Sequence, residues 1–155
     1  MSEFLKTFKI SKEWVDYNSH LNMAYYVLIF DKAWEVMLEK FQMGETSAKT
    51  TKKSTMAVES HTTYNNEVKE NEEVDVHLSY FNHDKKRLHY KLEMYEKSKN
   101  ILSATTEVLS LYIDLNIRKV AEFENEKLEI MDQFIEENKS KFKIDNLQFS
   151  NKLKK

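Results

Sequence analysis

One short segment of this 155-residue chain gathers side chains that can do chemistry. Asp16, His20 and Asn22 place a carboxylate, an imidazole and a carboxamide within seven positions, directly before a run with helical periodicity. A carboxylate next to a substrate can activate water as a general base or attack as a nucleophile. The first N–H groups of a helix lack intrahelical acceptors, so they can stabilise an oxyanion that develops on a carbonyl. This segment is therefore the candidate active site.

The same residues also have a purely structural interpretation. Asn22 is a good N-cap for the following helix, and Asp16 can close a preceding turn through its side chain. An aspartate and a histidine do not by themselves define a reaction. Composition alone leaves both interpretations open.

The segment lies between an expected strand and the clearest expected helix. Residues 4–10 partly alternate apolar and polar side chains, as a strand does. From Met23 to Phe41 the apolar side chains recur at helical spacing, and Gly44 lies just beyond, where helices commonly stop. The first two turns of this helix carry no charge, so we expect that end to be buried against a sheet.

Strand patterns dominate the chain after a polar link at 45–53. With one glycine and no proline in the chain, Asn82 and Asp84 must shape the turn between two of these strands. The order of elements predicts an α+β domain over residues 1–138, with one long helix packed on one antiparallel sheet. The expected later elements are strands at 54–66, 74–80, 88–95 and 101–115 and a short helix around 126–137.

Composition excludes several classes of protein. A single glycine cannot build a P-loop or a dinucleotide-binding fingerprint, and zero cysteines exclude disulfides, thiolate catalysis and zinc sites built on sulfur. No apolar run is long enough for a transmembrane helix, and the N-terminus has no export signal, so we expect a cytoplasmic protein with no membrane partner.

The C-terminal residues 139–155 differ in charge from the rest of the chain. They hold six lysines and one aspartate (+5), which leaves a net charge of −7 on residues 1–138. A basic tail can touch nucleic acid or phosphate, but a solvated terminus is the simpler interpretation, and we expect no nucleic-acid partner. His77, His83 and His89 are expected on the surface, and we expect no metal site.

The candidate segment resembles a known signature. Asp16-Tyr-Asn-Ser-His20-Leu-Asn22-Met resembles the Asp-x-x-Gly-His-x-Asn-Asn motif of hotdog-fold acyl-CoA thioesterases of the 4-hydroxybenzoyl-CoA thioesterase type. The resemblance covers roughly residues 4–125, and later segments, among them Val58-Glu59-Ser60-His61, look like the branch associated with carnitine and betaine metabolism. It implies a hotdog fold, a long central helix wrapped by an antiparallel sheet, paired in a homodimer or a dimer of dimers. Active sites in the family lie at the dimer interface.

The resemblance also implies an activity, the hydrolysis of an acyl-CoA thioester to free acid and coenzyme A, with no cofactor beyond the coenzyme A of the substrate. Asp16 takes the place of the catalytic carboxylate, as general base or nucleophile. His20 and Asn22 take the places of residues that position substrate or water, and the helix start near Asn22 and Met23 would polarise the carbonyl. A short or polar acyl group fits the branch.

Two departures from the motif bear on this function. Ser19 stands where the family usually has glycine, and Met23 stands where a second asparagine is common. If that glycine supplied a positive φ, Ser19 must adopt the same strained angle or the loop must differ and displace Asp16. A displaced carboxylate would leave a module that binds acyl-CoA, or a related ligand, without hydrolysing it.

The remaining candidates are substrate-binding residues, each with an ordinary structural alternative. Aromatic side chains near the motif can border an acyl pocket or pack in the core. Two polar residues on one face of a strand can reach a site or face solvent, and a basic turn can meet the phosphates of coenzyme A or simply be a hairpin tip. These residues are Tyr17 and Tyr26, Glu59 and His61, and Lys86 and Arg87.

Overall fold

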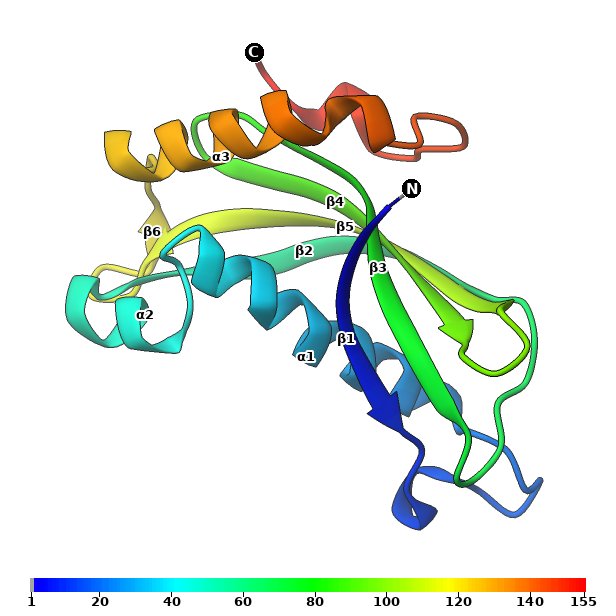
Figure 1. The fold of residues 1–155 in the computed structure, drawn as a ribbon. Coiled ribbons are helices and arrows are strands. Elements are labelled where there is room, and N and C mark those ends of the chain that lie inside the picture. Colours follow the sequence, from blue (N-terminus) through cyan, green and yellow to red (C-terminus); the bar gives the residue numbers. More distant parts are fainter. Residues whose placement is uncertain (1) are drawn as a thin grey trace.

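The computed structural model describes residues 2–155. One antiparallel sheet, in the order β1-β3-β4-β5-β2, curls over the helix α1; Figure 1 shows α1 beneath the sheet and α3 with the C-terminal segment above it. This confirms the predicted α+β fold, a long helix wrapped by an antiparallel sheet. No helix in the described residues is long and apolar enough to cross a membrane. The elements are β1 (Glu3–Lys9), α1 (Met23–Lys40), α2 (Glu45–Thr51), β2 (Lys53–Tyr64), β3 (Glu73–His83), β4 (Arg87–Glu96), β5 (Ile101–Asp114), β6 (Lys119–Val120), α3 (Asn125–Asn138) and short 3-10 turns at Lys12–Trp14, Lys139–Lys141 and Ser150–Lys152.

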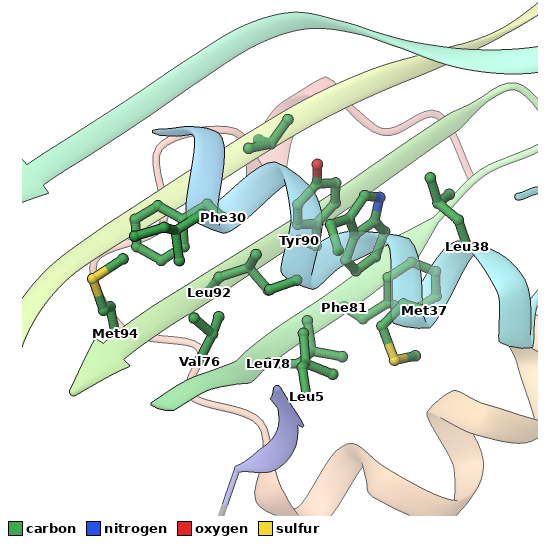
Figure 2. Close-up of a cluster of buried hydrophobic side chains, with 14 of the residues drawn as sticks. Leu5, Phe30, Met37, Leu38, Val76, Leu78, Phe81, Tyr90, Leu92 and Met94 are labelled. Carbon is green, nitrogen blue, oxygen red and sulfur yellow. The ribbon is translucent and has the colours of Figure 1, made fainter. Parts of the chain in front are cut away.

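The core fills the space between α1 and the concave face of the sheet. Trp34 of α1 stacks on Tyr90 of β4, with ring centroids 3.5 Å apart. Figure 2 shows Tyr90 beside α1, with its hydroxyl turned away from the aliphatic side chains of Val76 and Leu78. Burying each large apolar side chain contributes about 1.5–3 kcal/mol, so this face holds the helix on the sheet.

The end of α1 differs from the prediction. The chain reverses at Gln42, whose φ is 60°, and not at Gly44, whose φ is negative. The Met43 N–H donates to the Leu38 carbonyl and the Gln42 N–H donates to the Glu39 carbonyl, which together form a Schellman cap with glutamine in the usual glycine position. The predicted polar link at 45–53 is also wrong in part, because it contains α2.

The turn between β3 and β4 is built by Asp84, as predicted. Its Oδ1 accepts hydrogen bonds from the Lys86 and Arg87 N–H groups at 2.9 and 2.7 Å. Asn82, expected in the same turn, belongs to β3 instead. A carboxylate that accepts two successive N–H groups replaces the missing glycine by fixing the turn through its side chain.

Residues 139–155 form a segment that crosses the outer face of the sheet, and we call it the strap. Its Lys143 N–H donates to the Ser79 carbonyl of β3, its Phe149 N–H donates to Glu107 of β5, and its Lys154 N–H donates to Asp84. Phe149 is buried. The expectation of a solvated tail is therefore wrong, because buried carboxylates on the sheet hold the strap through its backbone.

Two of the histidines expected on the surface are buried. His89 is 0% exposed, and its Nε2 lies 2.7 Å from Glu107 Oε2. His83 is also buried, and its Nε2 lies 2.6 Å from Asp132 Oδ1. The strap and α3 cover the polar side of β3, β4 and β5, which the strand pattern alone had assigned to solvent. Residues 2–155 contain no group of three or more residues suited to hold a metal ion.

Candidate active site

The candidate segment forms a tight hairpin between β1 and α1. Val15 and Leu21 pair as an antiparallel bridge, the Ser19 N–H donates to the Asp16 carbonyl at 2.9 Å, and the Asp16 N–H donates to the His20 carbonyl at 3.3 Å. Residues 17–19 therefore form a three-residue hairpin loop, a geometry in which the last loop residue is left-handed. The Leu21 N–H donates to the Val68 carbonyl, which fixes the hairpin against the rest of the domain.

Ser19 occupies that left-handed position. Its φ is 66°, in the region that favours glycine. Serine therefore takes the backbone angle that the motif's glycine would supply, and the loop keeps its shape. The alternative function, a binding module with a displaced carboxylate, assumed that the loop changes its conformation when serine replaces glycine. The observed loop gives no support to that assumption.

The Ser19 angle leads to a stability prediction. We expect Ser19→Gly to raise the free energy of unfolding by up to about 1 kcal/mol. Serine is sterically strained at a positive φ and glycine is not, and we expect the relief of this strain to exceed the larger chain entropy that glycine loses on folding. Urea unfolding of the two proteins measures the difference. Ser103→Gly, at a buried strand position, is the matched control and should destabilise the protein. A loss of stability in Ser19→Gly would show that the serine side chain stabilises the loop.

The Asp16 carboxylate is held by donors on both oxygens. Oδ1 accepts the Asn18 N–H at 2.8 Å, and Oδ2 accepts Nδ2 of Asn22 at 3.2 Å. The Asn18 N–H is the largest cause of the lowered pKa of Asp16; burial opposes it by raising this pKa, and the Asn22 amide and the charge of His20 lower it further. Asp16 is therefore an ionised, oriented carboxylate.

Asn22 joins the carboxylate to the helix start. Its Oδ1 accepts the Ala24 N–H at 3.0 Å, so it is the N-cap of α1, while its Nδ2 donates to Asp16. The structural and the functional interpretations of Asn22 therefore describe one arrangement. The Tyr25 N–H donates to the Asn22 carbonyl, whereas the Met23 N–H donates to no acceptor in residues 2–155. One helix N–H remains available to polarise a carbonyl.

These groups line a cleft of about 430 Å³. Asp16, His20, Asn22 and Met23 form one side, and the end of β2 with the loop after it forms the other. This second side was not predictable from the sequence, because nothing in the spacing of Tyr64, Asn65, Asn66 and Glu67 places them opposite residues some forty positions earlier. Tyr26 borders the cleft, with its ring edge against Tyr64 and its hydroxyl donating to the Asn66 carbonyl at 3.3 Å.

Three of the predicted binding residues do not line this cleft. Tyr17, at the hairpin tip, is 95% exposed and does not line the cleft. Glu59 and His61 share a face of β2, as predicted, but it is the outer face: Glu59 lies 4.0 Å from Lys152 of the strap, and His61 is the cross-strand neighbour of Glu107. The structure does not bring these three side chains to the Asp16 cleft of the same chain.

Lys86 and Arg87 lie at the far end of the sheet from Asp16. Arg87 pairs with Leu111, and Leu111 pairs with Met56 near the start of β2, whereas Tyr64 in the cleft ends that strand. The Arg87 guanidinium is bound to the buried Asp84 carboxylate at 2.9 Å. Within one chain, the basic turn is therefore remote from the cleft, and Arg87 stabilises the turn.

The sequence and the fold of this chain are similar to those of known proteins. The family model of the thioesterase-like superfamily matches residues 10–134. Betainyl-CoA thioesterase of Pseudomonas aeruginosa is 32% identical over 130 residues, which cover 83% of this chain and 82% of the relative. A Staphylococcus aureus protein solved in complex with CoA has a TM-score of 0.79 at 21% identity, covering 100% of this chain and 96% of the other. DHNA-CoA thioesterase from Staphylococcus aureus has a TM-score of 0.80 at 14% identity, covering 89% and 93%.

A curled antiparallel sheet around one long helix is the hotdog fold, which this chain shares with these solved structures. The chain belongs to the thioesterase-like superfamily, and it is a thioester hydrolase.

Proposed function

We propose that this enzyme hydrolyses an acyl-CoA thioester to the free acid and coenzyme A. The observation that carries the proposal is the pairing of an ionised Asp16 carboxylate with the free Met23 N–H on the wall of one cleft. The thioester carbonyl would accept a hydrogen bond from the Met23 N–H. Negative charge that develops on this oxygen is then stabilised by the positive end of α1.

Asp16 can act by two routes. As a general base it takes a proton from water, and the resulting hydroxide adds to the carbonyl carbon before the C–S bond breaks and the thiolate leaves. As a nucleophile it adds to the carbonyl itself, expels the thiolate and forms a mixed anhydride that water hydrolyses. Hydroxylamine trapping separates the routes, because only an anhydride on Asp16 leaves a hydroxamate on the peptide that holds this residue.

Free-thiol release from a panel of acyl-CoA esters tests the activity. The panel should contain short, polar, long and aromatic acyl groups. We propose a short, polar acyl group, and the betainyl group is the first to test, because a relative at 32% identity is named for it. Release from none of the esters would contradict the proposed function.

We further propose a homodimer in which two β2 strands pair. β2 forms the edge of the sheet, and it exposes apolar side chains, among them Met56 and Val58 at 41% and 53%. An exposed apolar edge strand is a template for pairing with a second chain. In a two-fold antiparallel pair, the start of one β2 strand lies beside the end of the other, so the basic turn of one chain comes closer to the cleft of the other.

A charge at the centre of β2 tests this dimer. We expect Val58→Lys to give monomers, because two like charges would face each other near the two-fold axis. We also expect it to lower kcat/KM at least tenfold, which corresponds to a loss of ~1.4 kcal/mol of transition-state stabilisation. Light scattering after gel filtration measures the mass. Val120→Lys, at a similarly exposed valine on β6, is the matched control and should keep the wild-type mass. A Val58→Lys dimer with full activity would rule out this interface.

A further inference from the structure

A second cavity, of about 430 Å³, lies at the other end of the space between α1 and β2. It is bordered by the C-terminal half of α1, by α2 and by the start of β2. Its walls include the carboxylates of Asp31, Glu35 and Glu45 and the rings of Trp34 and Tyr90. None of these residues takes part in the steps derived for Asp16.

The cavity carries negative charge that the chain does not neutralise. Glu45 pairs with Lys49 at 2.9 Å, but neither Asp31 nor Glu35 has a cation within 4.0 Å in residues 2–155. Burial raises the pKa of Glu35 most, and the nearby charges of Asp31, Glu39 and Glu45 raise it further. Like charges crowded in this way are stabilised when a cation enters.

The wall also holds a polar atom without a partner. Trp34 is 3% exposed, and its Nε1–H meets no acceptor in the described chain, although Trp34 lines the cavity. A buried donor left unpaired is unfavourable, and an oxygen of a bound ligand would satisfy it. The cavity therefore offers carboxylates to a positive group, an N–H to an adjacent oxygen and aromatic surface to apolar atoms.

Charge decides which end of an acyl-CoA fits this cavity. The phosphates of coenzyme A are anionic and are repelled by three carboxylates, whereas a positively charged acyl group is attracted. A quaternary ammonium matches the walls best, because it has no N–H to satisfy and its methyl groups pack on aromatic rings.

We infer that this cavity binds the quaternary ammonium end of the acyl group, with Asp31 and Glu35 as the residues that select for its charge. The inference rests on the proposed thioester hydrolysis and deepens it, because it assigns the substrate class to named side chains.

Symmetry brings the acidic cavity to the Asp16 cleft. Within one chain, Asp31 lies eight residues beyond Met23 on α1, roughly 12 Å along the helix, which is farther than a short acyl group extends. The cavity is bordered by Ser54 and Thr55 at the start of β2, whereas the cleft is bordered by Tyr64 at its end. When two β2 strands pair antiparallel about a two-fold axis, the start of one lies beside the end of the other. The acidic cavity of one protomer then adjoins the Asp16 cleft of its partner.

Two esters of equal shape test the inference. Betainyl-CoA carries a trimethylammonium group, and 3,3-dimethylbutanoyl-CoA carries a tert-butyl group in its place. We expect the wild-type enzyme to favour the cationic ester, and Asp31→Asn and Glu35→Gln each to lower its kcat/KM about tenfold, chiefly through KM, with the neutral ester unaffected. Glu126→Gln, an exposed carboxylate in the first turn of α3 and outside the cavity wall, is the control and should change neither value more than about twofold.

Several outcomes would overturn the inference. Equal kcat/KM for the two esters in the wild-type enzyme would do so, as would variants that slow both esters alike. If neither these two esters nor any other ester of the panel is hydrolysed, the proposed function fails. Binding of tetramethylammonium, followed by saturation-transfer NMR, then tests the cavity by itself: binding that Asp31→Asn/Glu35→Gln abolishes supports the cation site, and no binding overturns it. Mixed dimers of Asp16→Asn and Asp31→Asn should exceed the summed activities of the separate variants only if two chains share each site.

Discussion

Replacing Asp16 with asparagine is expected to lower kcat at least about 100-fold while the fold remains intact, because general-base catalysis contributes about 10²–10⁴-fold and the nucleophilic route is lost as well. Asparagine has nearly the same shape, and its carbonyl can still accept the Asn18 N–H. The loss would therefore report the charge of Asp16 and not the collapse of its hairpin. Thiol release under saturating substrate measures kcat, and circular dichroism checks the fold.

Asp145→Asn supplies the matched control, because Asp145 is an exposed aspartate of the strap. It should keep wild-type turnover. Full activity in Asp16→Asn would remove both catalytic routes proposed for this residue.

The pH profile of the wild-type enzyme gives a second readout of Asp16. Its pKa is lowered chiefly by the Asn18 N–H, so the carboxylate stays ionised as the pH falls through the usual aspartate value of about 3.9. We therefore expect the acid limb of kcat/KM to lie below that value, and we expect Asn22→Ala, which removes the second donor to the carboxylate, to move the limb upward. An unchanged limb in Asn22→Ala would show that this amide does not tune Asp16.

Replacing Glu107 with alanine is expected to lower the free energy of unfolding by about 3–5 kcal/mol, because several buried donors lose their common acceptor at a cost of about 1–3 kcal/mol each. Glu107 is 0% exposed, accepts from His89 Nε2 and accepts the backbone N–H groups of Gln148 and Phe149. Its loss leaves a buried imidazole and two strap N–H groups without their partner. Urea unfolding measures the change, and limited trypsin digestion reports whether the lysines of the strap become accessible.

Glu126→Ala is the control for this experiment, because Glu126 lies exposed in the first turn of α3. It should change stability by no more than about 0.5 kcal/mol and leave the digestion pattern unchanged. A Glu107→Ala protein with wild-type stability and an undigested strap would show that other contacts hold the strap.

The fold was predictable where local pattern and burial agree. β3, β4 and α1 each bury one apolar face, and this burial produces the two-residue period of β3 and β4 and the helical spacing after Met23. The prediction failed where a distant segment changed the environment. His89 alternates with apolar neighbours and looks exposed, but it is buried because the strap, some sixty residues later, covers it. Local periodicity contains no information about such a cover.

Only one of the two walls of the cleft was predictable from the sequence. The spacing of Asp16, His20 and Asn22 identified one wall of the cleft, because a hairpin and a helix cap are local structures. The opposite wall, which includes Tyr64, depends on how β2 returns alongside α1. The acidic cavity was not predictable for a related reason: Asp31 and Glu35 look like the polar face of an amphipathic helix, and the sequence does not show that α2 and the start of β2 border the same cavity.

The strap has a consequence for assembly beyond a pair of chains. A bare antiparallel sheet offers a flat surface on which a second sheet can stack about 10 Å away. Here that surface is occupied by residues 139–155, whose own sequence carries a net charge of +5. Two copies that approached with these faces together would meet lysine against lysine, and the repulsion would be strongest at low ionic strength. Higher assemblies of this enzyme must therefore grow from another side of the molecule, or displace the strap first.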